Sequence, residues 1–565
     1  MELTKFRLLV TLFALFGLAL GLEPAPGRQD ATAPRQVAII GAGAAGSTAA
    51  YYLRTYAEAS GVVVNITIFE KTDRVGGRTL TIHPFGNLSL HVELGASIFI
   101  KKNHILYESV DAFKLKPRDP ELGADPKLGI WDGTEFVFQI NDKDSFWWTA
   151  FKIIRKYGIL APRRTQTLMQ STIAKFLKLY EEPYFPFKSL TQRTHELELV
   201  QTTGVTGEQF LKANDIDDLY AHDIVQASTR VNYASNLAAI HGLDTMVSMA
   251  PEGAMAVEGG NWQIFYKMVE NSQATIFFNR SVTAVSLHKP ENPGTASVKY
   301  TIRIDKSDYE EDYKLPFDNV IIANPYQFSK TSFQSGLFET PIDEIRYVQL
   351  HVTIFSSPFQ YSPAFFGLSD PKDVPGTILT TLGKDDEPTS GVDGAGKAGF
   401  FSISILRKVV NPATEKEEYL YKIFSPEKVT PEFLSRLFGI DVPDTFVDDP
   451  AEPDSALSPI SWYYPHVFYS YPKALPRVTF QDPIVGPGLY YTSGMESFIS
   501  TMETNALMGK NVARLIVDDI LGVESGGAVE ARGKEDEGWG LNEMWKNVWG
   551  CYNTAAPTET GFRDL

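Results

Sequence analysis

The sequence contains one cysteine, Cys551, among its 565 residues. A single cysteine excludes an intrachain disulfide, so we expect a large hydrophobic core to stabilise the fold. An excess of positive charge is also missing, because the formal net charge is −17. This charge argues against nucleic acid or an anionic membrane surface as a partner and leaves at most peripheral membrane contact. Beyond residue 21 no apolar run is long enough to span a bilayer, and we expect no metal site.

The N-terminus differs in character from the rest of the chain. Lys5 and Arg7 precede a short apolar run that ends in small residues at positions 19 and 21, a pattern typical of a signal-peptidase site. We therefore expect a signal peptide over residues 1–21, a linker over 22–35 and entry into the secretory pathway. Three N-x-S/T sequons agree with this route and predict glycans on Asn65, Asn87 and Asn279.

The strongest local signal begins at residue 36. An apolar run over 36–40, typical of a buried parallel strand, leads into G-x-G-x-x-G and then into a helical stretch over 47–56. Gly41 permits the tight turn, Gly43 lets the backbone approach a pyrophosphate, and Gly46 lets the helix pack closely on the strand. The helix N-terminus offers free N–H groups to the phosphates. The predicted contacts of this loop are Gly41, Ala42, Gly43, Ala44, Ala45 and Gly46.

A second β-rich run, residues 62–69, ends in Glu70, which Lys71 follows. The Glu70 carboxylate can accept hydrogen bonds from the ribose hydroxyls of an adenosine. The glycine loop and this acid support each other, and together they predict a dinucleotide site. The alternative is a glycine-rich turn in an α/β protein that binds no nucleotide.

The next segment, DRVGGRT over residues 73–79, resembles the R-x-G-G-R-x-x-T signature of the amine-oxidase-like flavoproteins. That group also includes phytoene desaturases and the GDP-dissociation inhibitors (GDI) of Rab proteins. The resemblance implies FAD as the cofactor and contacts from the tight turn and its arginine. It also implies small residues against the isoalloxazine ring. The implied contacts are Gly76, Gly77, Arg78, Gly95, Ala96 and Ser97.

The other FAD segments that this resemblance implies lie far along the chain. Residues 274–285 would provide Val282 to pack over the adenine, and residues 317–324 would form a strand that returns to the sheet. Residues 488–517 would form a strand, a glycine and a helix whose N-terminus points at the flavin. Many members carry an acid directly after that glycine, but Met495 stands there, so we expect only a backbone contact. The implied contacts are Gly494, Met495, Met502 and Glu503.

Other phrases resemble one narrower family, the prenylcysteine oxidases, also called prenylcysteine or farnesylcysteine lyases. They are RVNY over 230–233, AVEGGN over 256–261, Met502-Glu503, and GKN over 509–511. This resemblance implies a small-molecule substrate, farnesyl- or geranylgeranylcysteine, and O2 as the acceptor. It implies cleavage of the thioether to cysteine, a prenyl aldehyde and hydrogen peroxide during breakdown of prenylated proteins. It also implies a lysosomal, vacuolar or secreted enzyme, and no catalytic side chain is assigned.

We expect an α/β fold in which a Rossmann-type FAD-binding domain is interleaved with an α+β substrate domain, the two-domain amine-oxidase/GDI-like arrangement. The expected ranges are 36–104, 241–329 and 478–520 for the FAD domain, 105–240 and 330–477 for the substrate domain, and 521–565 for a C-terminal tail. An apolar face over 541–549 would dock on the body or rest on a lipid interface.

The densest aromatic segment, residues 462–471, could line a slot for a prenyl chain or form an ordinary core strand. The predicted substrate contacts are Tyr233, Trp462, Tyr464 and His466. Two other functions stay open: a different flavin oxidase on the same fold, acting for example on amines, and a non-catalytic GDI-like prenyl-binding protein. The intact glycine loop and Glu70 disfavour the second, because a protein without FAD does not need them.

Overall fold

The structure, a computed structural model, describes residues 34–119, 127–141, 143–250, 253–289, 298–305, 310–387, 393–444 and 458–524. The predicted signal peptide, most of the predicted linker, the apolar stretch over 541–549 and Cys551 lie outside these ranges. Among the helices in the described ranges, none is long and apolar enough to cross a membrane. The same residues contain no group of three or more His, Cys, Asp or Glu side chains that could hold a metal ion.

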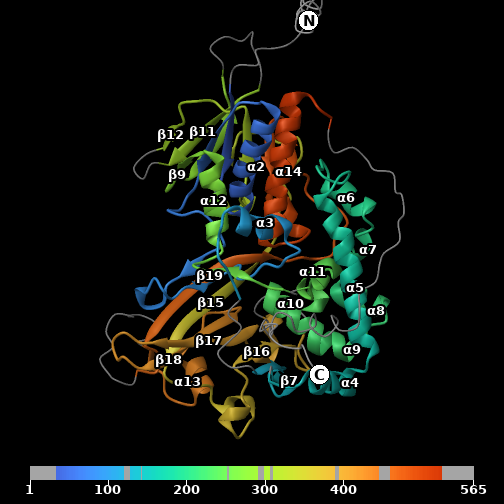
Figure 1. Cartoon of the computed structure of the whole chain (residues 1–565), viewed down its shortest axis with the longest axis vertical. Helices are drawn as coiled ribbons and strands as arrows, with labels where there is room; N and C mark the ends of the chain where they lie inside the picture. The colour runs from blue at the N-terminus through green and yellow to red at the C-terminus, as the bar shows by residue number, and fades with distance from the viewer. Residues whose placement is uncertain are drawn as a thin grey trace, which may run out of the picture.

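A six-stranded sheet forms the centre of the upper half of the molecule (Figure 1). Its strand order is β20 (Ile484–Gly486), β21 (Leu489–Tyr491), β13 (Asn319–Ile322), β1 (Arg35–Ile40), β2 (Val64–Phe69) and β9 (Thr275–Phe277). All neighbours pair in parallel except β20, which runs antiparallel to β21. Strands β1 and β13 are nearly continuous apolar runs because both of their faces are covered.

Successive residues of β1 point into two different cores. Val37 and Ile39 pack against the helices α2 (Ala44–Ser60), α12 (Trp262–Ser272) and α14 (Met502–Leu521). Ala38 and Ile40 pack toward a four-stranded sheet on the other face. The order of that sheet is β12 (Glu310–Asp312), β11 (Tyr300–Asp305), β10 (Val282–Leu287) and β14 (Ser332–Phe333). The nucleotide half is therefore a three-layer arrangement.

Helices α2 and α14 lie side by side on the sheet (Figure 1). A Cβ added to Gly509 of α14 would lie 2.2 Å from the Ala45 carbonyl oxygen of α2, so the two backbones approach closely because residue 509 is glycine. Helix α3 (His104–Ala112) packs against α14 and α12. The close approach of Gly509 to Ala45 thus holds α14 against the first turn of α2, directly after the glycine loop.

A seven-stranded mixed sheet forms the second half. Its order is β19 (Trp462–Pro472), β15 (Tyr347–Ser357), β18 (Glu417–Ser425), β17 (Ser402–Val410), β16 (Thr377–Thr380), β6 (Lys127–Trp131) and β7 (Phe136–Asn141). Two short ladders pair β3 (Thr81–Ile82) with β4 (Val92–Glu93) and β5 (Pro117–Arg118) with β8 (Ala256–Val257). Helix α13 (Pro431–Phe438) packs into the core beneath β15 and β18.

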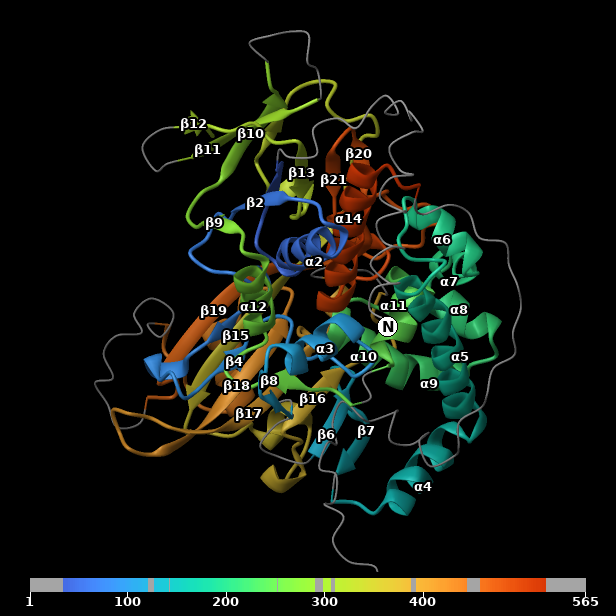
Figure 2. The ribbon, with the colours of Figure 1, turned by 45° about the horizontal axis from the view of Figure 1, so that its top comes forward.

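A group of helices runs along one side of the molecule, from the level of α14 to β16, β6 and β7 (Figure 2). They are α4 (Phe146–Tyr157), α5 (Leu160–Leu177), α6 (Leu190–Glu196), α7 (Val200–Thr203), α8 (Gly207–Ala213), α9 (Asp218–Tyr220), α10 (Gln226–Tyr233) and α11 (Gly242–Ser248). The predicted α/β class, with a Rossmann-type domain interleaved with an α+β domain, is confirmed. The predicted domain boundaries stay a prediction, and near 104 and 240 they cut across the packing. Helix α3 packs with the nucleotide half, and α11 packs against α5, α8 and α10.

Candidate functional site

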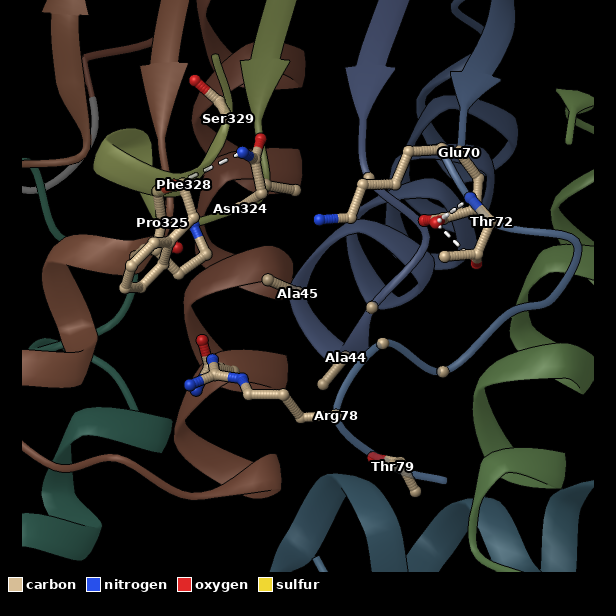
Figure 3. A pocket seen from close by; sticks show the side chains of 18 of the residues that line it. Ala44, Ala45, Glu70, Thr72, Arg78, Thr79, Asn324, Pro325, Phe328 and Ser329 are labelled. Carbon is tan, nitrogen blue, oxygen red and sulfur yellow. Dashed lines mark hydrogen bonds between the residues drawn. The ribbon is translucent and has the colours of Figure 1, made fainter. Parts of the chain in front are cut away.

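A cavity of about 570 Å³ lies at the carboxyl ends of β1, β2 and β13. In open parallel sheets, ligands bind at this edge. Its lining combines segments from the whole length of the chain (Figure 3). The predicted cofactor residues in the lining are Gly41, Gly43, Ala44, Ala45, Glu70, Lys71, Gly76, Gly77, Arg78, Gly95, Ala96, Val282 and Met502.

The three glycines of the first loop have three different surroundings. Gly41 has φ +103°, a conformation that favours glycine. A Cβ on Gly46 would lie 2.0 Å from the Gly41 carbonyl oxygen, so close packing of the helix on the loop requires glycine there. A Cβ on Gly43 would meet only the Gly77 Cα at 3.9 Å, an ordinary contact, so the protein itself leaves that space open. Glycine at position 43 therefore leaves space for a ligand, and packing of the fold does not require it.

Glu70 is fixed at the edge of the cavity by hydrogen bonds to both of its oxygens. Oε2 accepts from the Ala42 backbone N–H at 2.8 Å. Oε1 accepts from the Thr72 backbone N–H and the Thr72 hydroxyl, both at 2.8 Å (Figure 3). The carboxylate is thereby held between the glycine loop and the end of β2, where it can take further donors from a ribose.

Arg78 projects from the predicted signature into the cavity and joins the C-terminal segment. Its guanidinium donates to Glu496 Oε1 and Oε2 at 2.6 and 2.8 Å, and to the Ser470 carbonyl at 3.0 Å. The Tyr347 hydroxyl also donates to Glu496, at 2.9 Å. Burial alone would lower the pKa of Arg78, but the Glu496 carboxylate outweighs it and raises the pKa above the usual range. Arg78 is therefore a permanent cation at this wall.

Glu496 was missed by sequence reasoning. It stands two residues after Gly494, directly after Met495, and lines the cavity. Gly494 and Met495 do not line it. A Cβ on Gly494 would lie 2.7 Å from the Gln481 carbonyl oxygen, and Met495 is fully buried in the core. The acid two residues after Gly494 was therefore the signal in this segment.

The N-terminus of α14 reaches the same cavity. Thr501 forms a capping box with Thr504, and both Thr501 and Met502 line the wall. Glu503 points elsewhere: its carboxylate accepts the backbone N–H groups of Ile105 and Leu106 at 2.9 and 3.0 Å. Burial raises the pKa of Glu503 to about 7. Its contacts cap α3 rather than address the first cavity.

These features fit an extended dinucleotide such as FAD. Glu70 and Val282 lie at the end suited to adenosine, the open space at Gly43 suits the pyrophosphate, and Gly95 and Ala96 lie at the end suited to the isoalloxazine. The helix N-terminus of α14 brings a positive dipole end to that region. Ala42 and Gly46 complete the loop from behind the lining, with the Ala42 N–H bound to Glu70.

A second cavity of about 390 Å³ adjoins the first. Both are lined by Gly95, Ala96, Tyr471, Ser500, Thr501 and Met502. Its other walls are mostly apolar and come from α5, α10 and the seven-stranded sheet. They include Ile130, Ile173, Phe176, Leu177, Ile224, Ala227, Val231, Val247, Leu379, Leu406 and Phe424. An apolar chamber thus meets the isoalloxazine end of the cofactor site.

Lys422 brings a cation into this apolar chamber. Its ammonium group donates to the Glu93 carbonyl at 2.6 Å and to the Ser97 hydroxyl at 3.3 Å, and lies 4.8 Å from the Phe424 ring centre. Ser404 pairs with Lys422 across β17 and β18 and also lines the chamber. Burial lowers the pKa of Lys422 to about 8. No motif marked this lysine, because it occupies an ordinary position in a strand.

The predicted substrate residues divide into two groups. Tyr233 lines the second cavity and packs edge-on against Tyr471 at 5.7 Å, and Ser97 lines it too. Trp462, Tyr464 and His466 line neither cavity. Their rings stack in sequence at 6.2 Å along β19, away from the cofactor edge. The same strand reaches the first cavity only farther on, through Phe468, Tyr469, Ser470 and Tyr471.

The three sequon asparagines lie outside the site and are exposed. Asn65 lies within β2, whereas Asn87 and Asn279 lie in turns.

Two protein-family models match the chain. The prenylcysteine lyase family model matches residues 140–525, and a model of NAD(P)-binding Rossmann-like domains matches residues 39–113. Farnesylcysteine lyase of Arabidopsis thaliana is 28% identical over 507 residues, covering 87% of this chain and 90% of that protein. Prenylcysteine oxidase 1 of Bos taurus is 26% identical over 504 residues, covering 87% and 90%.

Solved structures show the same fold at low identity. Cyclohexylamine oxidase from Brevibacterium oxydans gives a TM-score of 0.52 at 14% identity, covering 86% of this chain and 100% of that one. Putrescine oxidase bound to putrescine gives 0.51 at 15%, covering 86% and 99%. The matched family model covers more than half of the 565 residues. The chain therefore belongs to the prenylcysteine lyase family and is an FAD-dependent oxidase.

Proposed function

We propose that this oxidase cleaves S-prenyl-L-cysteine, either farnesyl- or geranylgeranylcysteine. It would consume O2 and water and release cysteine, a prenyl aldehyde and hydrogen peroxide. The observation that carries the proposal is the apolar second cavity, which meets the cofactor cavity at Gly95 and Ala96. The names of the relatives, farnesylcysteine lyase and prenylcysteine oxidase, support the same substrate class.

The chemistry follows from the substrate. Bound FAD supplies a two-electron acceptor. Positive charge that develops at C1 of the prenyl group is shared by the adjacent sulfur and the allylic double bond. Water then adds to C1, and the resulting hemithioacetal separates into thiol and aldehyde. No strongly basic side chain is needed for hydride loss, so positioning of C1 is the main task of the protein.

The chamber walls perform this positioning. An isoprenoid chain would lie among the side chains of α5 and α10, including Ile173, Ala227 and Val231, and would exclude water there. The small residues Gly95 and Ala96 leave the boundary between the cavities open to C1. We further propose that Lys422 binds the cysteine carboxylate, because its ammonium group lies beside Ser97, next to that boundary.

Oxidation of an amine is the second candidate. The fold likeness to two amine oxidases does not distinguish the substrates, because it shows the fold alone. A protonated amine in the chamber would meet the like charge of Lys422, which is unfavourable at low dielectric. The cation therefore favours a substrate that carries a carboxylate, because Glu503, which also lines the chamber, has both of its oxygens bound to α3.

One assay separates these functions. The purified yellow protein is incubated with farnesylcysteine, geranylgeranylcysteine, a saturated S-alkyl cysteine, putrescine or cyclohexylamine, and peroxide, thiol and aldehyde are measured. We expect equal amounts of all three products from the prenylated substrates. If both C1 hydrogens are replaced by deuterium, one deuterium should remain in the aldehyde. The saturated analogue should react far more slowly. Equal kcat/KM for the saturated analogue, or turnover of an amine alone, would contradict the proposal.

We also propose a secretory route ending in a lysosome, a vacuole or the extracellular space. The support is the N-terminal sequence pattern and the exposure of Asn65, Asn87 and Asn279. N-terminal sequencing should find a mature chain that begins near Leu22, and glycosidase treatment should lower its mass. An intact Met1 on an unglycosylated cytosolic protein would refute this route.

A further inference from the structure

Helix α4 is apolar on its outer face as well as its inner face. Its inner face packs into the core through Ala150, Ile153 and Tyr157. The outer face leaves Trp147 80% exposed and Trp148, Phe151 and Ile154 between 41% and 51% exposed. Ile159 and Leu160, at the start of the following helix, are also half-exposed or more. Large apolar side chains exposed together on one helix face, next to polar residues, mark an interaction surface.

The charge around this helix is opposite to that of the whole protein. Residues 145–180 contain seven Lys or Arg residues and no Asp or Glu, although the chain has a net charge of −17. Lys152 and Lys156 are paired with Asp144 and Asp223, each at 2.7 Å. Arg155 and Arg163 are exposed. The net charge that argues against an anionic membrane surface is thus locally reversed.

A shallow depression of about 730 Å³ lies directly beside the helix. It is lined by Lys152, Arg155 and Lys156 of α4 and by residues 134–139 of β7 and the turn before it, with Glu135 as its acidic group. Cations are therefore grouped on one flank of the exposed aromatic residues. Aromatic residues beside Lys and Arg on one helix are the pattern of helices that lie in the headgroup region of a bilayer.

The position of α4 suits such a contact. It lies at the periphery of the molecule in both views, at the end opposite to the six-stranded sheet (Figures 1 and 2). Its inner face belongs to the same apolar cluster as Ile130, Ile173 and Ile224, which line the second cavity.

We propose that α4, with Ile159 and Leu160, binds the surface of an anionic lipid bilayer. Trp147, Trp148 and Phe151 would lie among the headgroups, and Arg155 and Arg163 would pair with headgroups of net negative charge. The proposal concerns binding alone and stands apart from the reaction proposed above. The acidic remainder of the chain would face away from the lipid and would take no part in the contact.

The test is sedimentation of the full-length protein with vesicles. One set is pure phosphatidylcholine, and the other contains about one third phosphatidylserine. We expect binding to the anionic set, weakened by salt, and little binding to the neutral set. The variant Trp147→Ser/Phe151→Ser should lower the partition coefficient at least about tenfold, because each side chain loses its burial in the interface. Arg155→Glu/Arg163→Glu should lower it for anionic vesicles only.

Matched controls remove similar groups elsewhere. Leu88 and Tyr266 are also exposed, so Leu88→Ser/Tyr266→Ser should bind as the parent does. Lys314→Glu/Lys416→Glu makes the same charge change at exposed positions away from α4. Equal binding by the α4 variants and these controls would overturn the proposal. So would a parent protein that ignores anionic vesicles but forms dimers that Trp147→Ser/Phe151→Ser dissociates. Loss of binding only when residues 525–565 are removed would assign the surface to the tail instead.

Discussion

Arg78 and Glu496 are 418 positions apart in the sequence and form a two-pronged ion pair at the wall of the cofactor cavity, with N–O distances of 2.6 and 2.8 Å. Glu496 is almost fully buried, whereas Arg78 is 34% exposed toward the cavity. The pair therefore joins the signature after β2 to the segment before α14, and the cofactor would lie against it.

Removal of the arginine should leave an uncompensated carboxylate. We expect Arg78→Met to lower the free energy of unfolding by about 2–3 kcal/mol, less than for a fully buried pair because the guanidinium is partly exposed. Urea denaturation of the apoprotein measures this change. Arg78→Met/Glu496→Gln should recover part of the loss, since the orphan charge is gone. A double variant less stable than the single would show that the pair does not account for the effect.

Gly43→Val should produce a folded but colourless protein. A Cβ there meets only the Gly77 Cα at 3.9 Å, so the added side chain fills the space meant for the pyrophosphate rather than striking the protein. Flavin absorbance per chain measures the loss, and circular dichroism checks the fold. The control is Ala59→Val, which changes an exposed position near the end of α2, the helix that follows Gly43. This variant should stay yellow. Stoichiometric flavin in Gly43→Val would refute the placement of the cofactor.

The charge on Lys422 should appear in the pH profile. Its pKa is lowered to about 8, so the side chain is cationic below that pH and neutral above it. Attraction of the substrate carboxylate is therefore present below pH 8 and lost as the pH rises through it. As the pH rises through 8, kcat/KM of the parent should fall toward the value of Lys422→Met, mainly because KM of the parent rises. Lys422→Arg, which stays charged, should show no such fall. Identical profiles for the parent and Lys422→Met would remove the assigned role.

The length of the prenyl chain should be limited by the chamber. Ala227 is buried in α10 and lines the cavity, so Ala227→Phe shortens or narrows the space. We expect kcat/KM to fall about tenfold or more for geranylgeranylcysteine and less for farnesylcysteine, with flavin content unchanged. Ala161→Phe, in the same apolar cluster but not in the cavity lining, controls for general overpacking. Equal losses for both substrates would indicate damage to the fold rather than a shorter chamber.

Local motifs predicted the nucleotide half well because its chemistry depends on the backbone. The turn at Gly41, the close packing at Gly46 and the acid at the end of β2 each require a particular residue at a fixed spacing. Glu496 escaped because the acid was expected directly after Gly494, whereas it stands two residues after that glycine. A search for any acid within the turn, rather than at one position, would have found it.

The substrate half could not be predicted in the same way. Its chamber is made mainly by ordinary apolar residues of α5, α10 and four strands, β6, β16, β17 and β18, whose meeting depends on tertiary packing alone. Aromatic density along β19 pointed to Trp462 and Tyr464, but only the later residues of that strand reach the cofactor edge. Lys422 occupies a strand position without any local signal. The residues that would decide the substrate are thus those that no sequence motif marks.

The strand order of the six-stranded sheet also bears on how the protein is made. Strand β1 is among the first elements to leave the ribosome, yet one of its two neighbours, β13, begins at residue 319, and the next strand, β21, at residue 489. During synthesis β1 must therefore wait, unpaired on one edge, until β13 has been made. Helix α14 closes the layer last. A nascent chain should therefore be unable to retain flavin until α14 has been made.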